Sequence, residues 1–395
     1  MDHPESEEWP SLKIATAPWI PQSSQTRAVA LEVLLYGPIS RTEIARRLDL
    51  SPGSLTRLST PLIKSGLLVE IESEDRSDSK TGRPSRPLDV VAGSRHFIGM
   101  KLTGEDVTAV VTDLRANVVA KGYRRLPSQT PEAVVAQITE LARELADQVE
   151  EITALGIGIG GLVNDKSEVL SAPFLNWENI PLGAMVERAT SIPTAINNDV
   201  IAFTEAEHWF GAASGLSNFA VITLGVGIGF GLVIHNQIVV DQDYGLGLVG
   251  HWPIDPFGPL CPSGHKGCAR TVLTQSAIIQ AVKSTLNRDF SYEEILQMAT
   301  SGEPVARRVI DDAGRGLGKL MAAVANLNSP ELIILGGEGV GLVEVASESI
   351  QEGIKENRDP RAKQIRFVTT SGDNTEWCRG AAVLAIQEYV LGNPY

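Results

Sequence analysis

The chain has 395 residues, of which 43% are hydrophobic and 21% charged. Because single domains commonly hold about 100–200 residues, two or three folded units are expected. The formal net charge of −14 excludes a protein that coats nucleic acid over its whole surface. The first residues lack the basic start and apolar run of a secretion signal, and no run reaches the roughly 18 apolar residues of a membrane span. We therefore expect a cytoplasmic protein without membrane contact.

Helical periodicity begins shortly after the N-terminus. Residues 1–21 show no periodic pattern, which predicts a flexible arm, and apolar residues recur at helical spacing from Gln25 onward. Ser40 and Glu43 have the spacing of a capping box, in which each side chain bonds to the backbone N–H of the other residue. A short second helix is predicted over residues 42–48.

The next segment completes a small DNA-binding domain. Ser51, which is followed by a proline, can cap a third helix. Residues 67–71 and 87–91 are strand-like and are separated by a polar loop over 72–85. Three helices followed by a hairpin predict a winged helix-turn-helix over residues 22–92.

The third helix is expected to enter the major groove of double-stranded operator DNA. In a helix-turn-helix, the N-terminal residues of the recognition helix meet the base edges. This position selects Ser51, Ser54, Thr56 and Arg57. A guanidinium can bond to both acceptors on the edge of a guanine, so Arg57 is the main candidate for base recognition.

Other basic residues extend the predicted DNA-binding surface. Arg41 and two further arginines of the supporting helix make the balance of charge positive over residues 40–64. In the predicted wing tip, Arg83 and Arg86 flank a short proline-containing stretch, which suits a narrow A·T-rich minor groove. A solvated loop is the alternative for such a tip alone, but the complete helix-turn-helix before it favours DNA binding.

From residue 93 to residue 395 the pattern changes to that of an α/β protein. Three strand-like runs are followed by an amphipathic helix over 131–148 and a glycine-rich strand, ITALGIGIG. The second half repeats the theme, with the strands of FAVITLGVGIGFGLVI, helices over 270–284 and 305–327, and a strand over 332–335. Two similar α/β lobes around a cleft are expected.

The most specific motif lies between Gly225 and Cys268. The sequences GVGIGFG and GHWPIDPFGPLCPSGHKGC resemble the second phosphate loop and the GH…CxCGxxGC signature of the ROK family of repressors, open reading frames and sugar kinases. The resemblance covers about residues 25–390. It implies a winged helix ahead of a two-lobed sugar-kinase-like domain of the actin-like ATPase and ribonuclease H-like class.

The kinase chemistry of that family is altered in this chain. Family kinases begin the domain with a DxGGT loop, whose Asp helps to bind metal and phosphate. Alignment of the strands places Lys101 at the Asp and Glu105 at the Thr. A carboxylate at that place repels triphosphate, so we expect neither ATP binding nor enzyme activity.

The resemblance also implies residues that bind a sugar. Asp199 matches the catalytic base and Asn198 matches a sugar contact, and with no phosphate donor both are expected to bind by hydrogen bonds alone. The alternative for Asp199 is a cap on the following helix. The other implied contacts are Gly161, Asn176 and His251.

Two further positions of the sugar pocket depart from the family pattern. The family has a Glu three residues before the GH histidine and another two residues after the last Cys, and this chain has Leu248 and Arg270 there. The loss of two acceptors disfavours an ordinary hexose. Arg270 favours an anionic effector such as a sugar phosphate, through a charge-assisted hydrogen bond.

The cysteines indicate a local site and a reducing compartment, because Cys261 and Cys268 lie close together in sequence and the third cysteine lies far from both. The resemblance implies structural zinc bound by His251, Cys261 and Cys268, with a third cysteine at position 263. Serine occupies that position, and His265 offers a nitrogen two residues later. Zinc and a tightly packed loop without metal both remain open.

The sequence therefore predicts a transcription regulator, most simply a repressor of carbohydrate genes, controlled by a sugar or sugar phosphate. Because helix-turn-helix proteins commonly bind two half-sites, a homodimer or homotetramer is expected. The alternatives are a sugar kinase with an accessory DNA-binding domain and a DNA-binding regulator that needs no ligand.

Overall fold

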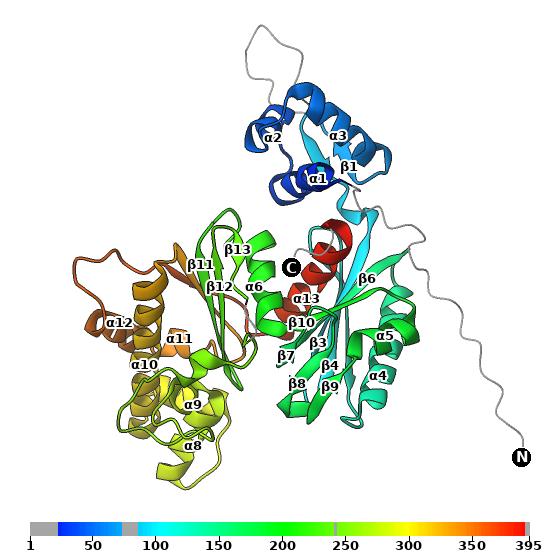
Figure 1. Cartoon of the computed structure of the whole chain (residues 1–395). Helices are drawn as coiled ribbons and strands as arrows, with labels where there is room; N and C mark the ends of the chain where they lie inside the picture. Colours follow the sequence, from blue (N-terminus) through cyan, green and yellow to red (C-terminus); the bar gives the residue numbers. More distant parts are fainter. Residues whose placement is uncertain (1–22, 73–85, 241–242, 392–395) are drawn as a thin grey trace, which may run out of the picture. The chain divides into compact units, whose positions relative to one another are not determined.

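The computed structural model describes residues 23–72, 86–240 and 243–391, and these belong to two compact units (Figure 1). The predicted arm over residues 1–21 lies outside the described residues. The first unit contains the chain up to residue 159, residues 163–197 and the chain from residue 381, and the second contains residues 160–162 and 198–380. Each unit is therefore built from several separate segments of the chain, and the first unit includes the N-terminal domain.

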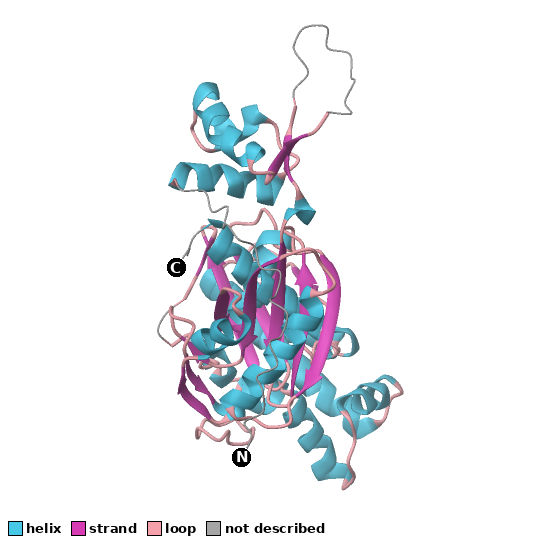
Figure 2. Ribbon diagram, turned by 90° about the vertical axis from the view of Figure 1, so that its right-hand side faces the viewer, coloured by secondary structure: helices cyan, strands magenta, loops and turns pink. Residues whose placement is uncertain are grey.

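The N-terminal domain consists of three helices and a two-stranded antiparallel sheet, which confirms the predicted elements (Figure 2). Its core is formed by the buried faces of the helices together with Leu68 and Leu88 of the hairpin. Ser51 caps the third helix and accepts a hydrogen bond from Ser54 N at 3.2 Å. The elements are α1 (Ser24–Tyr36), α2 (Arg41–Arg47), α3 (Pro52–Lys64), β1 (Leu68–Glu70) and β2 (Leu88–Val90).

The capping box predicted at the start of α2 is only half present. Ser40 Oγ accepts from Glu43 N at 3.1 Å, as predicted. The carboxylate of Glu43 instead accepts hydrogen bonds from the side chains of Arg46 and Arg47. Two guanidinium groups within reach attract the carboxylate more strongly than one backbone N–H does.

The first unit has a five-stranded sheet in the order β10-β6-β3-β4-β5. Strand β3 lies at its centre, pairs antiparallel with β4 and parallel with β6, and is buried at six of its seven positions. The strands are β3 (His96–Leu102), β4 (Asp106–Thr112), β5 (Val118–Arg125), β6 (Ile152–Ile159) and β10 (Thr194–Asn198).

Helices and a smaller sheet cover this central sheet. Apolar residues of α4 (Pro131–Ala146) and α5 (Leu182–Thr190) share a core with β3, β4 and β6. The small strands β7 (Leu162–Val163), β8 (Val169–Ala172) and β9 (Trp177–Ile180) form a separate sheet, in which β8 and β9 are antiparallel.

The second unit repeats this topology, with strand order β13-β12-β11-β14-β15. Here β11 is central, pairs antiparallel with β12 and parallel with β14, and is buried at all six positions. An antiparallel meander followed by parallel strands in both units agrees with the predicted sugar-kinase-like fold. The strands are β11 (Phe219–Leu224), β12 (Ile228–Ile234), β13 (Gln237–Ile238), β14 (Leu332–Gly336) and β15 (Phe367–Thr369).

The helices of the second unit differ in detail from the prediction. The helix expected over residues 270–284 is two helices, because Thr274 adopts an extended conformation and caps the second one. None of the described helices is long and apolar enough to cross a membrane. The remaining helices are α6 (Asp199–Phe210), α7 (Ala269–Leu273), α8 (Gln275–Leu286), α9 (Tyr292–Thr300), α10 (Pro304–Asn328), α11 (Leu342–Val345), α12 (Ser347–Glu356) and α13 (Asn374–Leu391).

Candidate DNA-binding surface and effector site

Helix α3 presents a polar face to solvent. Its apolar residues Leu55, Leu58 and Leu62 are buried, whereas Thr56 and Arg57 are exposed. Within the described part of the chain, the guanidinium of Arg57 has no hydrogen-bond or ion-pair partner. An unpaired guanidinium on the exposed face of a recognition helix is available to a base edge.

The other predicted base-contacting residues form bonds within the helix. Ser51 Oγ donates to Ser54 Oγ at 3.0 Å, and Thr56 Oγ1 donates to Pro52 O at 3.0 Å. These bonds fix the start of α3 and leave further lone pairs on the hydroxyl oxygens. Contact of these hydroxyls with DNA stays a prediction.

The surrounding arginines are less available than the sequence count implied. Arg41 and Arg86 both lie against the carboxylate of Glu70 in β1, at 2.7 Å and 3.6 Å. Arg83 lies outside the described residues. Glu70 therefore reduces the positive charge of this surface. It belongs to the hairpin and lies outside residues 40–64, over which the positive balance was predicted.

A turn of the first lobe contacts the winged helix directly. The guanidinium of Arg115 donates to Gly37 O at 3.0 Å and pairs with the carboxylate of Asp89 in β2. Beside it, Leu114 N donates to Ala92 O at 3.0 Å, and the Leu114 side chain is fully buried. These contacts connect the β4–β5 turn to the DNA-binding domain.

The β3–β4 turn is the segment predicted to correspond to the first phosphate loop. Thr103 Oγ1 accepts from Glu105 N at 3.2 Å and from Asp106 N at 3.1 Å. Lys101 is buried in β3 and Glu105 is exposed. Two backbone N–H groups of this turn, those of Glu105 and Asp106, are thus bonded to a threonine hydroxyl within the turn itself.

The predicted sugar contacts lie in both units, with Asn176 in the first and Gly161, Asn198 and Asp199 in the second. Asn198, and not Asp199, caps α6: its Oδ1 accepts from Val200 N at 2.9 Å. Its Nδ2 donates to Gly161 O at 2.9 Å. The helix-capping role considered for Asp199 therefore belongs to the residue before it.

Two polar residues near Asp199 were missed in the sequence. The hydroxyl of Tyr244 donates to Phe230 O at 3.0 Å. Burial raises the pKa of Tyr244, and the nearby carboxylates of Asp199 and Glu205 raise it further. Tyr244 lies just before the GH motif, but nothing in the local pattern indicates that its phenol approaches a carboxylate 45 residues earlier in sequence.

The structure brings together the predicted metal ligands. Nδ1 of His251 lies 3.6 Å from Cys261 Sγ, 3.0 Å from Nδ1 of His265 and 3.9 Å from Cys268 Sγ. Zinc bonds of about 2.1 Å to nitrogen and about 2.3 Å to sulfur place tetrahedral ligands about 3.3–3.8 Å apart. His251, Cys261 and His265 therefore form a candidate metal site, with their ligand atoms within 4.8 Å of one another, and Cys268 Sγ lies beside His251.

Electrostatics at this cluster also favour a metal ligand. Burial by itself raises the pKa of the Cys261 thiol, but hydrogen bonds from the backbone of His265 and Ser263 and from the side chains of His265 and Cys268 lower it to about 6. A thiolate is the form of cysteine that binds zinc. The three cysteines are free of disulfides.

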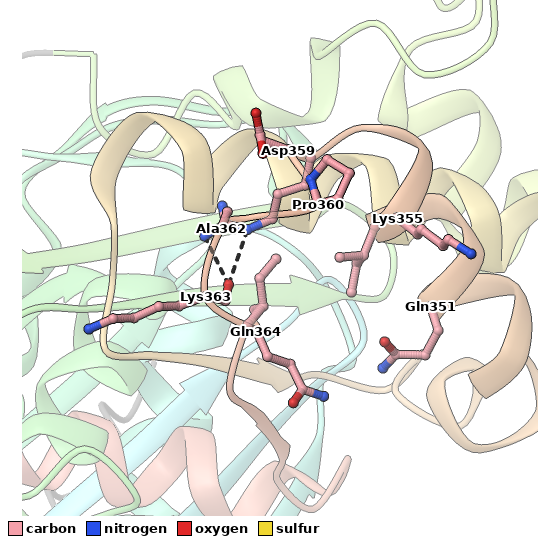
Figure 3. Close-up of a pocket in the computed structure, with 10 residues that line it drawn as sticks. Gln351, Lys355, Asp359, Pro360, Ala362, Lys363 and Gln364 are labelled. Carbon is pink, nitrogen blue, oxygen red and sulfur yellow. Dashed lines mark hydrogen bonds between the residues drawn. The ribbon is translucent and has the colours of Figure 1, made fainter.

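A pocket elsewhere in the second unit contains none of the predicted site residues. It lies between α12 and the loop that follows, where Arg358 donates to Lys363 O (Figure 3). Because none of the predicted effector contacts lines this pocket, it does not support the predicted effector site.

Comparison with known proteins identifies related sequences. The sequence profile of the ROK family matches residues 97–388. The chain is 30% identical over 319 residues to the DNA-binding transcriptional dual regulator NagC of Escherichia coli (strain K12), covering 77% of each protein. It is 24% identical to the DNA-binding transcriptional repressor Mlc of the same strain, covering 92% of this chain and 94% of Mlc. The xylose repressor of Bacillus subtilis (strain 168) is 25% identical and is covered over 79% of its length, by 77% of this chain.

Solved structures show the same relationship. A ROK family transcriptional regulator described as a homolog of E. coli MLC superposes with a TM-score of 0.80 and 28% identity, covering 93% of this chain and 98% of that one. A ROK family glucokinase from Streptomyces griseus, in complex with glucose and AMPPNP, superposes with a TM-score of 0.65 and 26% identity. That match covers 74% of this chain and 99% of the kinase.

Proposed function

The chain belongs to the ROK family, and we propose that it is a DNA-binding transcriptional regulator, most simply a repressor, of carbohydrate-metabolism genes. The observation that carries the proposal is the exposed, unpaired Arg57 on the recognition helix of a winged helix joined to a ROK domain. Two related proteins are named as a DNA-binding transcriptional repressor and as a xylose repressor. The domain boundaries we propose are 22–92 for the winged helix and 93–395 for the ROK domain, after an arm over 1–21.

We further propose that the chain is not an enzyme. The turn that would approach phosphate has two of its N–H groups, those of Glu105 and Asp106, bonded to the Thr103 hydroxyl, and Glu105 is exposed. Asp199 retains the position of a catalytic base, but a base alone does not supply a phosphate donor. A sugar kinase with an accessory DNA-binding domain is therefore the less supported alternative.

The effector we propose is a sugar or sugar phosphate bound near Gly161, Asn176, Asn198, Asp199 and His251. Asn198 and Gly161 are held to each other by the 2.9 Å hydrogen bond, and a Cβ on Gly245, which has a φ of +95°, would collide with Gly161 O. The Asp199 carboxylate and the side-chain amides of Asn176 and Asn198 can form hydrogen bonds with hydroxyl groups. Such groups on a tightly packed backbone suit a ligand with several hydroxyls. A difference in the effector's affinity for two conformations would shift the affinity for DNA.

Zinc at His251, Cys261, His265 and Cys268 would stabilise the loop that presents His251. All four positions of a tetrahedral ion are then occupied by protein, so the zinc would be structural and not catalytic. A bound ion would stabilise the folded loop because the unfolded chain offers no preformed site. A closed ligand set is consistent with a regulator.

The proposed DNA contact is tested with the full-length protein and operator DNA from its own promoter region. Arg57→Ala should lose about 1–3 kcal/mol of discrimination between operator and scrambled DNA. The matched control is Lys64→Ala, which removes an exposed positive charge from the C-terminal end of the same helix. It should lower both affinities equally, because phosphate contacts carry no sequence information.

Fluorescence anisotropy at several salt concentrations measures both affinities. Loss of discrimination in Arg57→Ala but not in Lys64→Ala supports the proposal. Absence of salt-dependent binding in the wild type, or equal discrimination in both variants, contradicts it. Repeating the titration with added sugars and sugar phosphates separates a ligand-controlled regulator from one that needs no ligand.

A further inference from the structure

The second glycine loop of the ROK domain lies where an anion is favoured. It connects β11 to β12 over residues 225–227, and Gly225 N donates to Gly227 O at 3.1 Å. The N-terminal residue of α8 is adjacent, because Gln275 N donates to Gly225 O at 3.2 Å. Glycine loops beside the positive end of a helix dipole commonly receive phosphate groups.

A protein carboxylate already lies against this loop. Glu338 follows β14, and a Cβ placed on Gly225 would collide with Oε2 of Glu338 and lie 3.1 Å from its Cδ. The two residues are 113 positions apart in the chain. The side chain of Glu338 therefore covers the first glycine of the loop.

The backbone around Glu338 is held in place by two hydrogen bonds. Gly337 has a φ of +88°, and Gly339 N donates to Leu224 O at 2.8 Å, which ties the segment to the end of β11. Gln275 Nε2 donates to Glu338 O at 3.0 Å. The carboxylate is thus presented to the loop by a fixed backbone, and no cation among the described residues pairs with it.

We propose that the carboxylate of Glu338 supplies a negative charge that excludes nucleotides and other polyphosphates from the glycine loop. An uncompensated carboxylate repels a phosphate group brought to the same few ångströms, and it occupies the space above Gly225. Glu338 is therefore a specificity-determining residue of the effector domain. This inference rests on the proposed function and deepens it, because it names a ligand class that the regulator rejects.

The inference is tested by calorimetric titration of the full-length protein with ADP and with inorganic pyrophosphate, each with Mg²⁺. Glu338→Gly removes the side chain, and Glu338→Gln keeps its size but removes its charge. The matched control is Glu344→Gln, which neutralises another exposed carboxylate of the same unit. Melting temperatures confirm that each variant is folded.

We expect no binding by the wild type or Glu344→Gln at millimolar ligand, and at least tenfold tighter binding by both Glu338 variants. Equal binding by wild type and variants, binding by none of them, or a gain confined to Glu338→Gly would overturn the proposal. Operator binding is measured in the same preparations. If the Glu338 variants gain nucleotide binding but the wild type does not bind DNA, the proposed function fails and this inference stands.

Discussion

The contact between Arg115 and the winged helix makes a quantitative prediction. Arg115→Ala removes the hydrogen bond to Gly37 O and the ion pair with Asp89. Hydrogen bonds that involve a charged group contribute about 1.5–3 kcal/mol, and exposed ion pairs contribute about 0–1 kcal/mol. The two side chains are 24% and 25% exposed, so we expect a loss of about 1–2 kcal/mol, between those limits.

The loss should appear as easier local opening of the DNA-binding domain. Ile39 and Leu88 form reciprocal backbone hydrogen bonds of 2.9 Å and 2.8 Å near the contact, and their amide exchange reports this opening. A loss of 1–2 kcal/mol corresponds to exchange that is about 5–30 times faster. Hydrogen exchange followed by mass spectrometry of the full-length protein measures this local opening. The measurement does not assume that the DNA-binding domain and the rest of the chain unfold together.

A double-mutant cycle and a control make the prediction refutable. Arg115→Ala, Asp89→Ala and the double variant should show an interaction energy of at least about 0.5 kcal/mol, as expected for directly contacting residues. Arg125→Ala removes an exposed positive charge from β5 and should leave the exchange of Ile39 and Leu88 unchanged. Equal exchange in Arg115→Ala and Arg125→Ala would refute the reasoning.

Two further predictions concern the second unit. Purified protein should contain about one zinc per chain by elemental mass spectrometry; Cys268→Ser should lose it and melt at a lower temperature, while Cys378→Ser, outside the ligand set, should retain it. A metal-free wild type of undiminished stability would show that the loop is only packed. Burial raises the pKa of Glu207, although the backbone N–H of Ala212 and the charge of Arg379 lower it. Because the pKa of Glu207 is raised in the folded protein, its ionisation lowers stability above that pKa, and this cost disappears as the pH falls toward the ordinary carboxyl pKa of 4.5. The amide oxygen of Glu207→Gln can still accept from Ala212 N. This variant should therefore have a higher melting temperature than the wild type at pH 8, and the difference should shrink toward pH 5. A difference in melting temperature that does not change with pH would contradict this.

The N-terminal domain was predictable because its signals are local. Ser51 caps α3 as predicted, since the capping hydroxyl and the N–H that it accepts from are three residues apart. The charge balance of the same domain was misjudged because Glu70 reaches Arg41 only after the hairpin folds back. The Glu43 carboxylate likewise accepts hydrogen bonds from Arg46 and Arg47, and the capping-box spacing does not predict these partners.

The effector domain shows the same division between local and distant signals. The spacing of Cys261 and Cys268, together with His251, indicated a metal site. The structure places the candidate substitute ligand His265 beside His251 and Cys261. Glu338 and Tyr244 were missed because the fold, and not a short sequence spacing, brings Glu338 to Gly225 and Tyr244 to Asp199. A sequence motif states which residues are present, but it does not state which distant side chain covers them.

One strand connects the turn that carries Glu105 with the turn that contacts the DNA-binding domain. Strand β4 begins beside the β3–β4 turn that carries Glu105 and ends at the turn that carries Arg115. Its seven residues span about 23 Å at about 3.3 Å per residue. Strand β4 is paired on both sides, with β3 and with β5. One seven-residue strand therefore joins the turn that carries Glu105 to the turn that contacts the DNA-binding domain.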